Sequence, residues 1–333
     1  MCGLITIVLF WRIAARILTG WDVPYAVGLV ALGTPLIYFS SQVQQYSSDT
    51  AATVLVIWAV LWLRQDPSDV RRALVAAGVG APTVWLLLPA MFILAGIGAA
   101  LAASAMVEGR RTGCRSLFMV GAARVLSAGL AAALALRTVP PADRAYLDWY
   151  WSGGFMPVPP RTLDEALWVW HRLTWLFGKL GTGLRRTNGG LGYPCSQLFV
   201  LLAAVGVGAL WRRQRETALI LLGPVLVTLM GAALHVCPFT GRALSFLLPA
   251  LLLATAAGAD HALRNWPGRL QFASPALLAL AVGSPAYAYL YDLSDGHRLR
   301  ASSSDDYPVA AASAYEGLAR WGCYGTQSPL GRF

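Results

Sequence analysis

The stretch that decides the fold reads QLFVLLAAVGVGALWRRQRETALILLGPVLVTLMGAALHV over residues 197–236. Two apolar runs, 197–211 and 217–236, flank a short polar segment that carries three arginines. An α-helix of about 20 apolar residues crosses a bilayer. Because short cytoplasmic loops carry an excess of Lys and Arg, the arginine segment predicts a cytoplasmic turn between two membrane spans.

The same pattern recurs along the chain, where arginine groups alternate with apolar pairs joined by loops that hold few or no basic residues. We therefore expect an all-α fold, a polytopic transmembrane helical bundle. Its spans number about ten, some shorter than usual: 3–19, 23–41, 50–64, 73–88, 89–107, 116–136, 197–211, 217–236, 243–263 and 270–291. The arginines at the expected cytoplasmic ends are Arg12, Arg16, Arg64, Arg71, Arg72, Arg110, Arg111, Arg115, Arg212, Arg213, Arg215, Arg264 and Arg269.

Composition agrees with a chain that uses lipid as its solvent. Only 13% of the residues are charged and the mean hydropathy is +0.56, whereas soluble domains have roughly 25% charged residues. A net charge of +10 would ordinarily suggest nucleic acid as a partner. Because membrane topology accounts for half of the basic residues, we expect no nucleic-acid binding. The five cysteines share no CxxC or CxxH spacing, which excludes the usual zinc and redox motifs.

These spans divide the chain into four regions. Residues 1–136 hold the N-terminal transmembrane helices, 137–196 an extracytoplasmic loop, 197–292 the C-terminal transmembrane helices, and 293–333 a polar tail that we expect to be disordered. Only Pro89 marks the break between the fourth and fifth spans, so one kinked or re-entrant element is an alternative there. The alternation also places Met1 outside, and we expect an upstream span and outer loop to be missing.

The extracytoplasmic loop contains a predicted helix of its own. Thr162 and Glu165 have the spacing of a capping box, and a helix from 163 to about 180 follows. Its apolar residues recur at helical spacing, namely Leu163, Leu167, Trp170, Leu173, Phe177 and Leu180, together with Trp168 and Trp175. A Trp-rich amphipathic helix beside a membrane is typical of one that lies in the interface plane.

The most specific local string is LIYFSSQVQQYSSD over residues 36–49, which joins the second and third spans at the outer face. One interpretation is a polar connector in which Ser48 or Asp49 caps the third helix, and the capping preferences favour this role for Asp49. The other is a hydrogen-bonding wall for a polyhydroxylated ligand at the membrane surface.

Four segments in the same order resemble the integral-membrane glycosyltransferases of the GT-C class. They are residues 36–49, the stretch WLLLPAMF at 85–92, residues 151–160 with their final Pro-Pro, and PFTGR at 238–242 followed by Phe246 and Pro249. The closest resemblance is to bacterial relatives of the protein O-mannosyltransferases and to the RgtA/B/C/D-like transferases.

The resemblance implies transfer of a sugar from a polyprenyl-phosphate carrier to a lipid, glycan or protein acceptor at the outer face of a bacterial cytoplasmic membrane. In this family an acidic residue of the first outer loop acts as general base or orients the acceptor, often with a divalent metal, Mg or Mn. Basic residues hold the lipid phosphate. By this resemblance we expect substrate contacts from Tyr38, Gln42, Gln44, Tyr46 and Arg242.

Arg242 is the only basic residue in the short outer loops, which favours a phosphate contact over a side chain that merely anchors in the headgroups. The sequence also departs from the family. Gln42 replaces an acid and Gln44 a basic residue, and the catalytic carboxylate is not identified, which leaves Asp49 as one candidate beside the acids of the long outer loop. A catalytically inactive truncated relative or membrane scaffold is therefore the alternative. A lipid-linked saccharide transporter ranks third because the chain shows no clear internal repeat.

Overall fold

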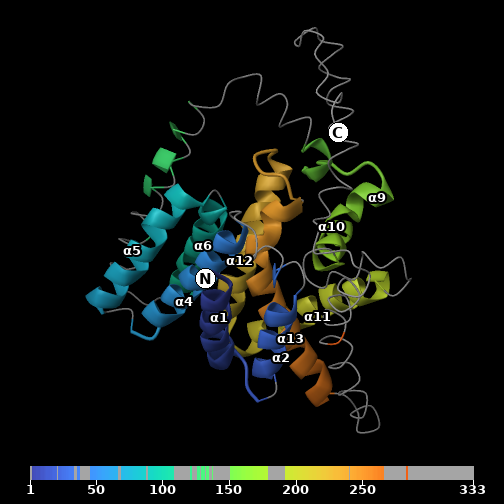
Figure 1. Cartoon of the computed structure of the whole chain (residues 1–333). Coiled ribbons are helices and arrows are strands. Elements are labelled where there is room, and N and C mark those ends of the chain that lie inside the picture. Colours follow the sequence, from blue (N-terminus) through green and yellow to red (C-terminus); the bar gives the residue numbers. More distant parts are fainter. Residues whose placement is uncertain are drawn as a thin grey trace, which may run out of the picture. The chain divides into compact units, whose positions relative to one another are not determined.

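Within the residues that the computed structural model describes, all regular secondary structure is helical (Figure 1). These residues are 2–20, 22–33, 36–37, 46–66, 69–87, 89–108, 121, 126–127, 129–131, 133–134, 137, 151–178, 192–239, 241–265 and 283. The chain forms two compact units, residues 1–291 and 292–333, and every described helix belongs to the first. The predicted spans 116–136 and 270–291 fall largely, and the tail entirely, outside the described residues.

The helices follow one another as the alternation of apolar and charged segments predicts. In chain order they are α1 (Cys2–Ile17), α2 (Asp22–Leu32), α4 (Tyr46–Leu63), α5 (Val70–Leu86), α6 (Ala90–Glu108), the 3₁₀ turn η1 (Ser152–Gly154), α9 (Leu163–Ala166), α10 (Trp168–Leu176), α11 (Gly192–Arg213), α12 (Arg215–Ala233), the 3₁₀ segment η4 (Gly241–Leu247) and α13 (Leu248–Asn265). Three helical segments are long and apolar enough to cross a membrane: Tyr46–Leu63, Arg215–Ala233 and Leu244–Asn265. Their length and composition indicate a membrane protein.

Two boundaries decide between sequence-based alternatives. Helix α5 ends at Leu86, Leu87 is extended (φ −139°, ψ 111°) and α6 begins at Ala90, so the segment around Pro89 separates two helices. The expected span 23–41 is interrupted, because α2 ends at Leu32 and Gly33 is not helical, although Leu36 and Ile37 are helical again. Gly33 is followed by Thr-Pro in the sequence, and glycine together with the residue before proline disfavours further helix.

Small residues let neighbouring helices approach closely. Helix α11 packs along α13, and α6 packs along α12. A Cβ added to Gly96 of α6 would lie 2.3 Å from the backbone of Gly223 in α12, far inside van der Waals contact. Without a hydrophobic driving force between helices in lipid, close backbone packing at small residues is a main source of association.

Helix α4 lies in the interior of this bundle. It contacts α1, α5, α6, α13 and η4, and ten of its residues are buried. Its other eight residues are partly buried and none is exposed. Helix α4 therefore presents no fully open face to water or lipid. The largest fully buried side chains of the surrounding elements include Phe10, Ile93 and Phe246.

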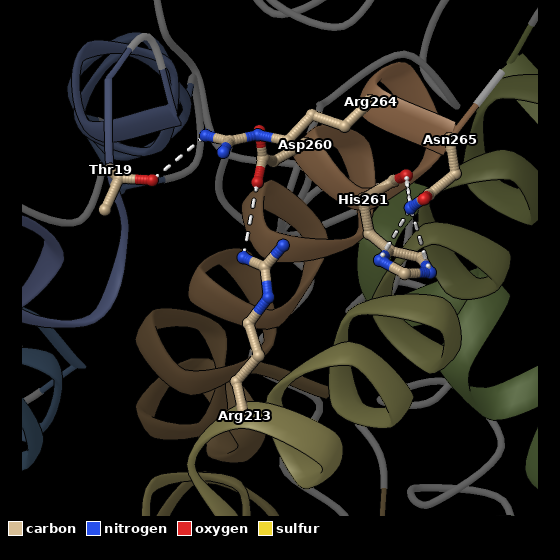
Figure 2. A network of polar contacts seen from close by, with 6 residues as sticks. All are labelled: Thr19, Arg213, Asp260, His261, Arg264 and Asn265. Carbon is tan, nitrogen blue, oxygen red and sulfur yellow. Dashed lines mark hydrogen bonds and ion pairs between the residues drawn. The ribbon is translucent and has the colours of Figure 1, made fainter.

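Polar contacts join the arginine-rich ends of the helices to one another. Arg64, after α4, forms an ion pair with Glu216 in the first turn of α12. Arg213 of α11 and Arg264 of α13 both approach Asp260 (Figure 2). These contacts place the described arginine-rich ends together, as expected if they share one side of the membrane.

Candidate functional site

Asp49 lies in the first turn of α4, the helix on which the expected site was centred. Asp49 is 2% exposed, and its Oδ1 atom is buried without a hydrogen-bond partner among the described residues. The expected capping role is wrong, because the helix begins at Tyr46 and Asp49 is already inside it. The helix dipole still favours a carboxylate in a first turn. An unsatisfied buried carboxylate oxygen is costly, so this atom is the most notable feature at this end of the chain.

The other residues of the 36–49 string are only partly described. Tyr38, Gln42 and Gln44 lie outside the described residues. Tyr46 is half-buried against the core, and its carbonyl accepts a hydrogen bond from Thr50 Oγ1 at 3.0 Å. Of the five residues expected to contact substrate, the structure therefore places two. It places Tyr46 by its side chain and Arg242 by its backbone.

The segment that carries Arg242 packs against the helix that carries Asp49. Arg242 is the second residue of η4, and η4 contacts α4. Phe239 and Phe246 anchor the segment, since both are fully buried. Ser245 of η4 is also fully buried, and its Oγ has no hydrogen-bond partner in the part of the chain that the structure describes. Two packed elements thus each carry a buried polar oxygen that is unsatisfied.

A cavity of about 190 Å³ lies beside the start of α4. It is lined by the hydroxyl-bearing residues Thr6, Ser47 and Thr50 and by aliphatic residues of α1, α2 and the 36–37 segment. Ligand pockets usually measure about 300–1,000 Å³. The cavity alone is therefore too small to hold a lipid-linked sugar.

Residues 151–178 dock on the turn that precedes η4. The Phe239 N–H donates to the Gly154 carbonyl (2.8 Å), and the Met156 N–H donates to the Ala232 carbonyl (3.2 Å). The Phe155 ring stacks on His235 with centroids 4.9 Å apart. This segment of the predicted outer loop is consequently tied to the end of α12 by backbone and aromatic contacts.

His235 occupies a position that usually requires glycine. Helix α12 ends at Ala233, and His235 follows its C-cap with φ 57° in the left-handed region. The N–H groups of His235 and Val236 donate to the carbonyls of Ala232 and Gly231, the hydrogen bonds of a Schellman motif. A histidine tolerates this conformation better than most residues, and here its ring is held by Phe155. Sequence reasoning missed this position.

The capping box predicted at the start of the loop helix is confirmed. Thr162 Oγ1 accepts from the Glu165 N–H at 3.2 Å, and Glu165 accepts from the Thr162 N–H at 3.3 Å. A single helix from 163 to about 180 is wrong, because the chain bends at Leu167 (φ −84°, ψ 3°) between α9 and α10. Only the second part is anchored, with Leu176 fully buried.

Arg172 of α10 is a further basic side chain that sequence reasoning did not select. Its guanidinium lies over the Trp168 ring at 5.4 Å and donates to the Gly153 carbonyl. Trp168 in turn packs against Phe239, with centroids 6.1 Å apart. Burial lowers the pKa of Arg172 from its ordinary value. The available signal was the (i, i+4) spacing of Trp168 and Arg172 on one helix face.

The acidic residues that the structure describes do not assemble a divalent metal centre. Among the described residues no group of three His, Cys, Asp or Glu side chains could hold a metal ion. Mg²⁺ and Mn²⁺ need several oxygen ligands, usually with carboxylates among them, and Glu165 is engaged in the capping box. The Mg or Mn implied by the resemblance therefore has no described site.

No protein-family model matches this chain, and no curated protein matches it significantly. The chemistry must accordingly be argued from the residues themselves. A buried carboxylate with an unsatisfied oxygen can accept a hydrogen bond or a proton from a hydroxyl group. An arginine on an adjoining segment supplies positive charge that suits a phosphate.

Proposed function

We propose that this chain is a membrane glycosyltransferase of the GT-C type. It transfers a sugar from a polyprenyl-phosphate donor to a lipid, glycan or protein acceptor at the extracytoplasmic face. The three long apolar segments then belong to a multi-pass bundle of about ten spans in a bacterial cytoplasmic membrane. Residues 137–196 form the extracytoplasmic loop, and its Trp-rich helix lies in the interface plane.

The packing of η4 against α4 is the observation that carries the proposal. The two elements are distant in sequence, and each holds one of the segments that resemble the family, 36–49 and 238–249. Activating a hydroxyl group requires a positioned carboxylate, and a phosphate leaving group requires nearby positive charge. The contact supplies both residue types on adjoining elements.

The proposal assigns one residue to the acceptor and one to the donor. Asp49 receives or orients the acceptor hydroxyl, which its unsatisfied Oδ1 atom favours. Arg242 holds the phosphate of the donor. Tyr38, Gln42, Gln44 and Tyr46 contact the sugar or the acceptor as hydrogen-bonding groups.

A second candidate is a catalytically inactive relative that serves as a membrane scaffold. Specific observations favour it: the acid expected at position 42 is an amide, Glu165 is used to start α9, and the described acids do not assemble a metal site. The scaffold differs from the transferase in one measurable respect: it binds donor or acceptor without turnover.

A transfer assay tests the proposal. Membranes that contain the full chain would be supplied with radiolabelled polyprenyl-phosphate sugars, and label entering lipid, glycan and protein would be followed. Asp49→Asn and Arg242→Ala are the test variants. Asp164→Asn is the matched control, because Asp164 is an exposed acid of α9.

Loss of a positioned general base lowers turnover by roughly 10²–10⁴-fold, so we expect Asp49→Asn to fall in this range while Asp164→Asn keeps the wild-type rate. Equal rates in Asp49→Asn and wild type would remove Asp49 from the mechanism. If folded wild-type protein transfers sugar from none of the donors, the result would favour the inactive scaffold.

A further inference from the structure

Two arginines from different helices converge on one buried carboxylate (Figure 2). Arg264 of α13 donates through Nε to Asp260 Oδ1, four residues earlier on the same helix. Arg213, at the end of α11, places Nη1 3.7 Å from Asp260 Oδ2. Arg264 also donates through Nη2 to Thr19 Oγ1 at 3.0 Å, in the segment between α1 and α2. Asp260 and Thr19 therefore orient the Arg264 guanidinium, and the ion pair with Asp260 brings Arg213 close to it.

Each guanidinium is held on one side and open on the other. The side chains of Arg213 and Arg264 are 53% and 51% exposed, whereas that of Asp260 is 10% exposed. A guanidinium group has five N–H donors in a planar fork. The hydrogen bonds of Arg264 to Asp260 and Thr19 use only part of its set and orient the donors that remain, which lowers the entropic cost of binding a ligand. Arg213 is held near Asp260 by the ion pair alone.

The charges around this cluster do not cancel. The Asp22 carboxyl adjoins that of Asp260, and burial together with the Asp260 charge raises the pKa of Asp22 to about 7. Asp22 is therefore partly protonated near neutral pH, so the two positive charges of Arg213 and Arg264 face less than two full negative charges. The nearby exposed arginines add more positive charge, and no carboxylate among the described residues pairs with them: Arg16, Arg212 and Arg215.

We propose that Arg213, Arg264 and Thr19 form a binding site for a phosphate group, supplied by an anionic phospholipid headgroup of the cytoplasmic leaflet. Arginine forks bind phosphate through two parallel hydrogen bonds, and basic sites between helices at the cytoplasmic side are suited to anionic headgroups. Trp211, two residues before Arg213, is 43% exposed, as expected for a side chain at a lipid interface. The site is independent of glycosyl transfer.

Native mass spectrometry of the full chain in detergent tests this assignment. Dioleoylphosphatidylglycerol, dioleoylphosphatidylcholine and sodium phosphate are the three probes. The test variant is Arg213→Gln/Arg264→Gln. The matched control is Arg212→Gln/Arg215→Gln, which removes the same number of charges, from the α11–α12 turn beside Arg213. Arg213→Lys/Arg264→Lys keeps the charge and removes the planar fork, and serves if the Gln pair does not fold.

We expect the wild type to retain phosphatidylglycerol roughly 10- to 30-fold better than phosphatidylcholine, since each basic residue near a membrane surface contributes roughly fivefold. The Gln pair should lose most of this preference and the Lys pair part of it. The control pair should lose clearly less than the Gln pair, because Arg212 and Arg215 contribute only diffuse charge and no oriented fork. Equal losses in the Gln pair and the control would overturn the site in favour of diffuse charge. Displacement of phosphatidylglycerol by an equal concentration of inorganic phosphate would overturn the lipid assignment.

Discussion

Gly206 of α11 and Gly258 of α13 lie where the backbones of the two helices are in contact. A Cβ on Gly206 would lie 1.7 Å from the Ala254 carbonyl oxygen, and one on Gly258 would lie 1.8 Å from the Leu202 carbonyl oxygen. Both distances lie far below any van der Waals contact, so a side chain at either position must push the helices apart.

We expect Gly206→Ala to destabilise the protein by about 1–3 kcal/mol or more, the usual range for overpacking. Gly208→Ala is the matched control, because a Cβ there meets nothing within 4 Å and alanine favours a helix over glycine. Thermal unfolding in detergent measures both. A Gly206→Ala variant as stable as Gly208→Ala would contradict the packing of α11 on α13.

The ion pair between Arg64 and Glu216 should contribute to the association of α4 with α12. The two side chains are 15% and 27% exposed, so water screens them incompletely. Glu216→Gln should lower the free energy of unfolding by about 1.5–3 kcal/mol, the range for hydrogen bonds to charged groups. Arg215→Gln, in the same turn and exposed, should change it by less than about 0.5 kcal/mol. If the two changes are the same, the pair is not formed.

Asp22 should make stability depend on pH. Burial, followed by the charge of Asp260, raises the pKa of Asp22 from 3.8 to about 7. The folded chain therefore holds a proton that the unfolded chain releases above about pH 4. The contribution of Asp22 to stability should be fully present below about pH 4, fall as the pH rises to about 7, and then level off. Thermal midpoints of wild type and Asp22→Asn between pH 4 and 8 test this, and parallel curves would refute it.

Cys237 should react slowly with thiol reagents. Its side chain forms no disulfide with a described cysteine, and burial raises the pKa of the Cys237 thiol to about 11. Because the thiolate is the reactive form, alkylation should accelerate about tenfold per pH unit between 8 and 10. A variant with serine at the other four cysteines isolates this reaction. Unfolding should accelerate it by roughly 100-fold or more at pH 8; equal rates in both states would contradict the burial.

The long apolar helices could be predicted from the sequence because each ends near arginines. The expected spans 50–64 and 217–236 correspond to α4 and α12 within four residues at each end. The length of α2 and the bend at Leu167 were not predicted. Both depend on local backbone conformation, which a hydrophobic pattern does not encode.

The candidate site could be predicted only as separate segments. The residues 36–49 and 238–249 were selected, but their contact joins elements far apart in the chain, and no local pattern specifies such a pairing. His235 gave no sequence signal, because its role depends on a left-handed backbone angle and on Phe155 from another segment.

The interior position of α4 has a consequence for how the protein is made. Its neighbours η4 and α13 are synthesised long after it, and at about 5–20 residues per second the chain from Leu63 to Gly241 takes roughly 10–40 s. Throughout that interval α4 lacks the packing against η4 and α13 that it has in the finished fold. The newly made helix must therefore be sheltered, by the insertion machinery or by α1, before the last third of the polypeptide arrives to enclose it.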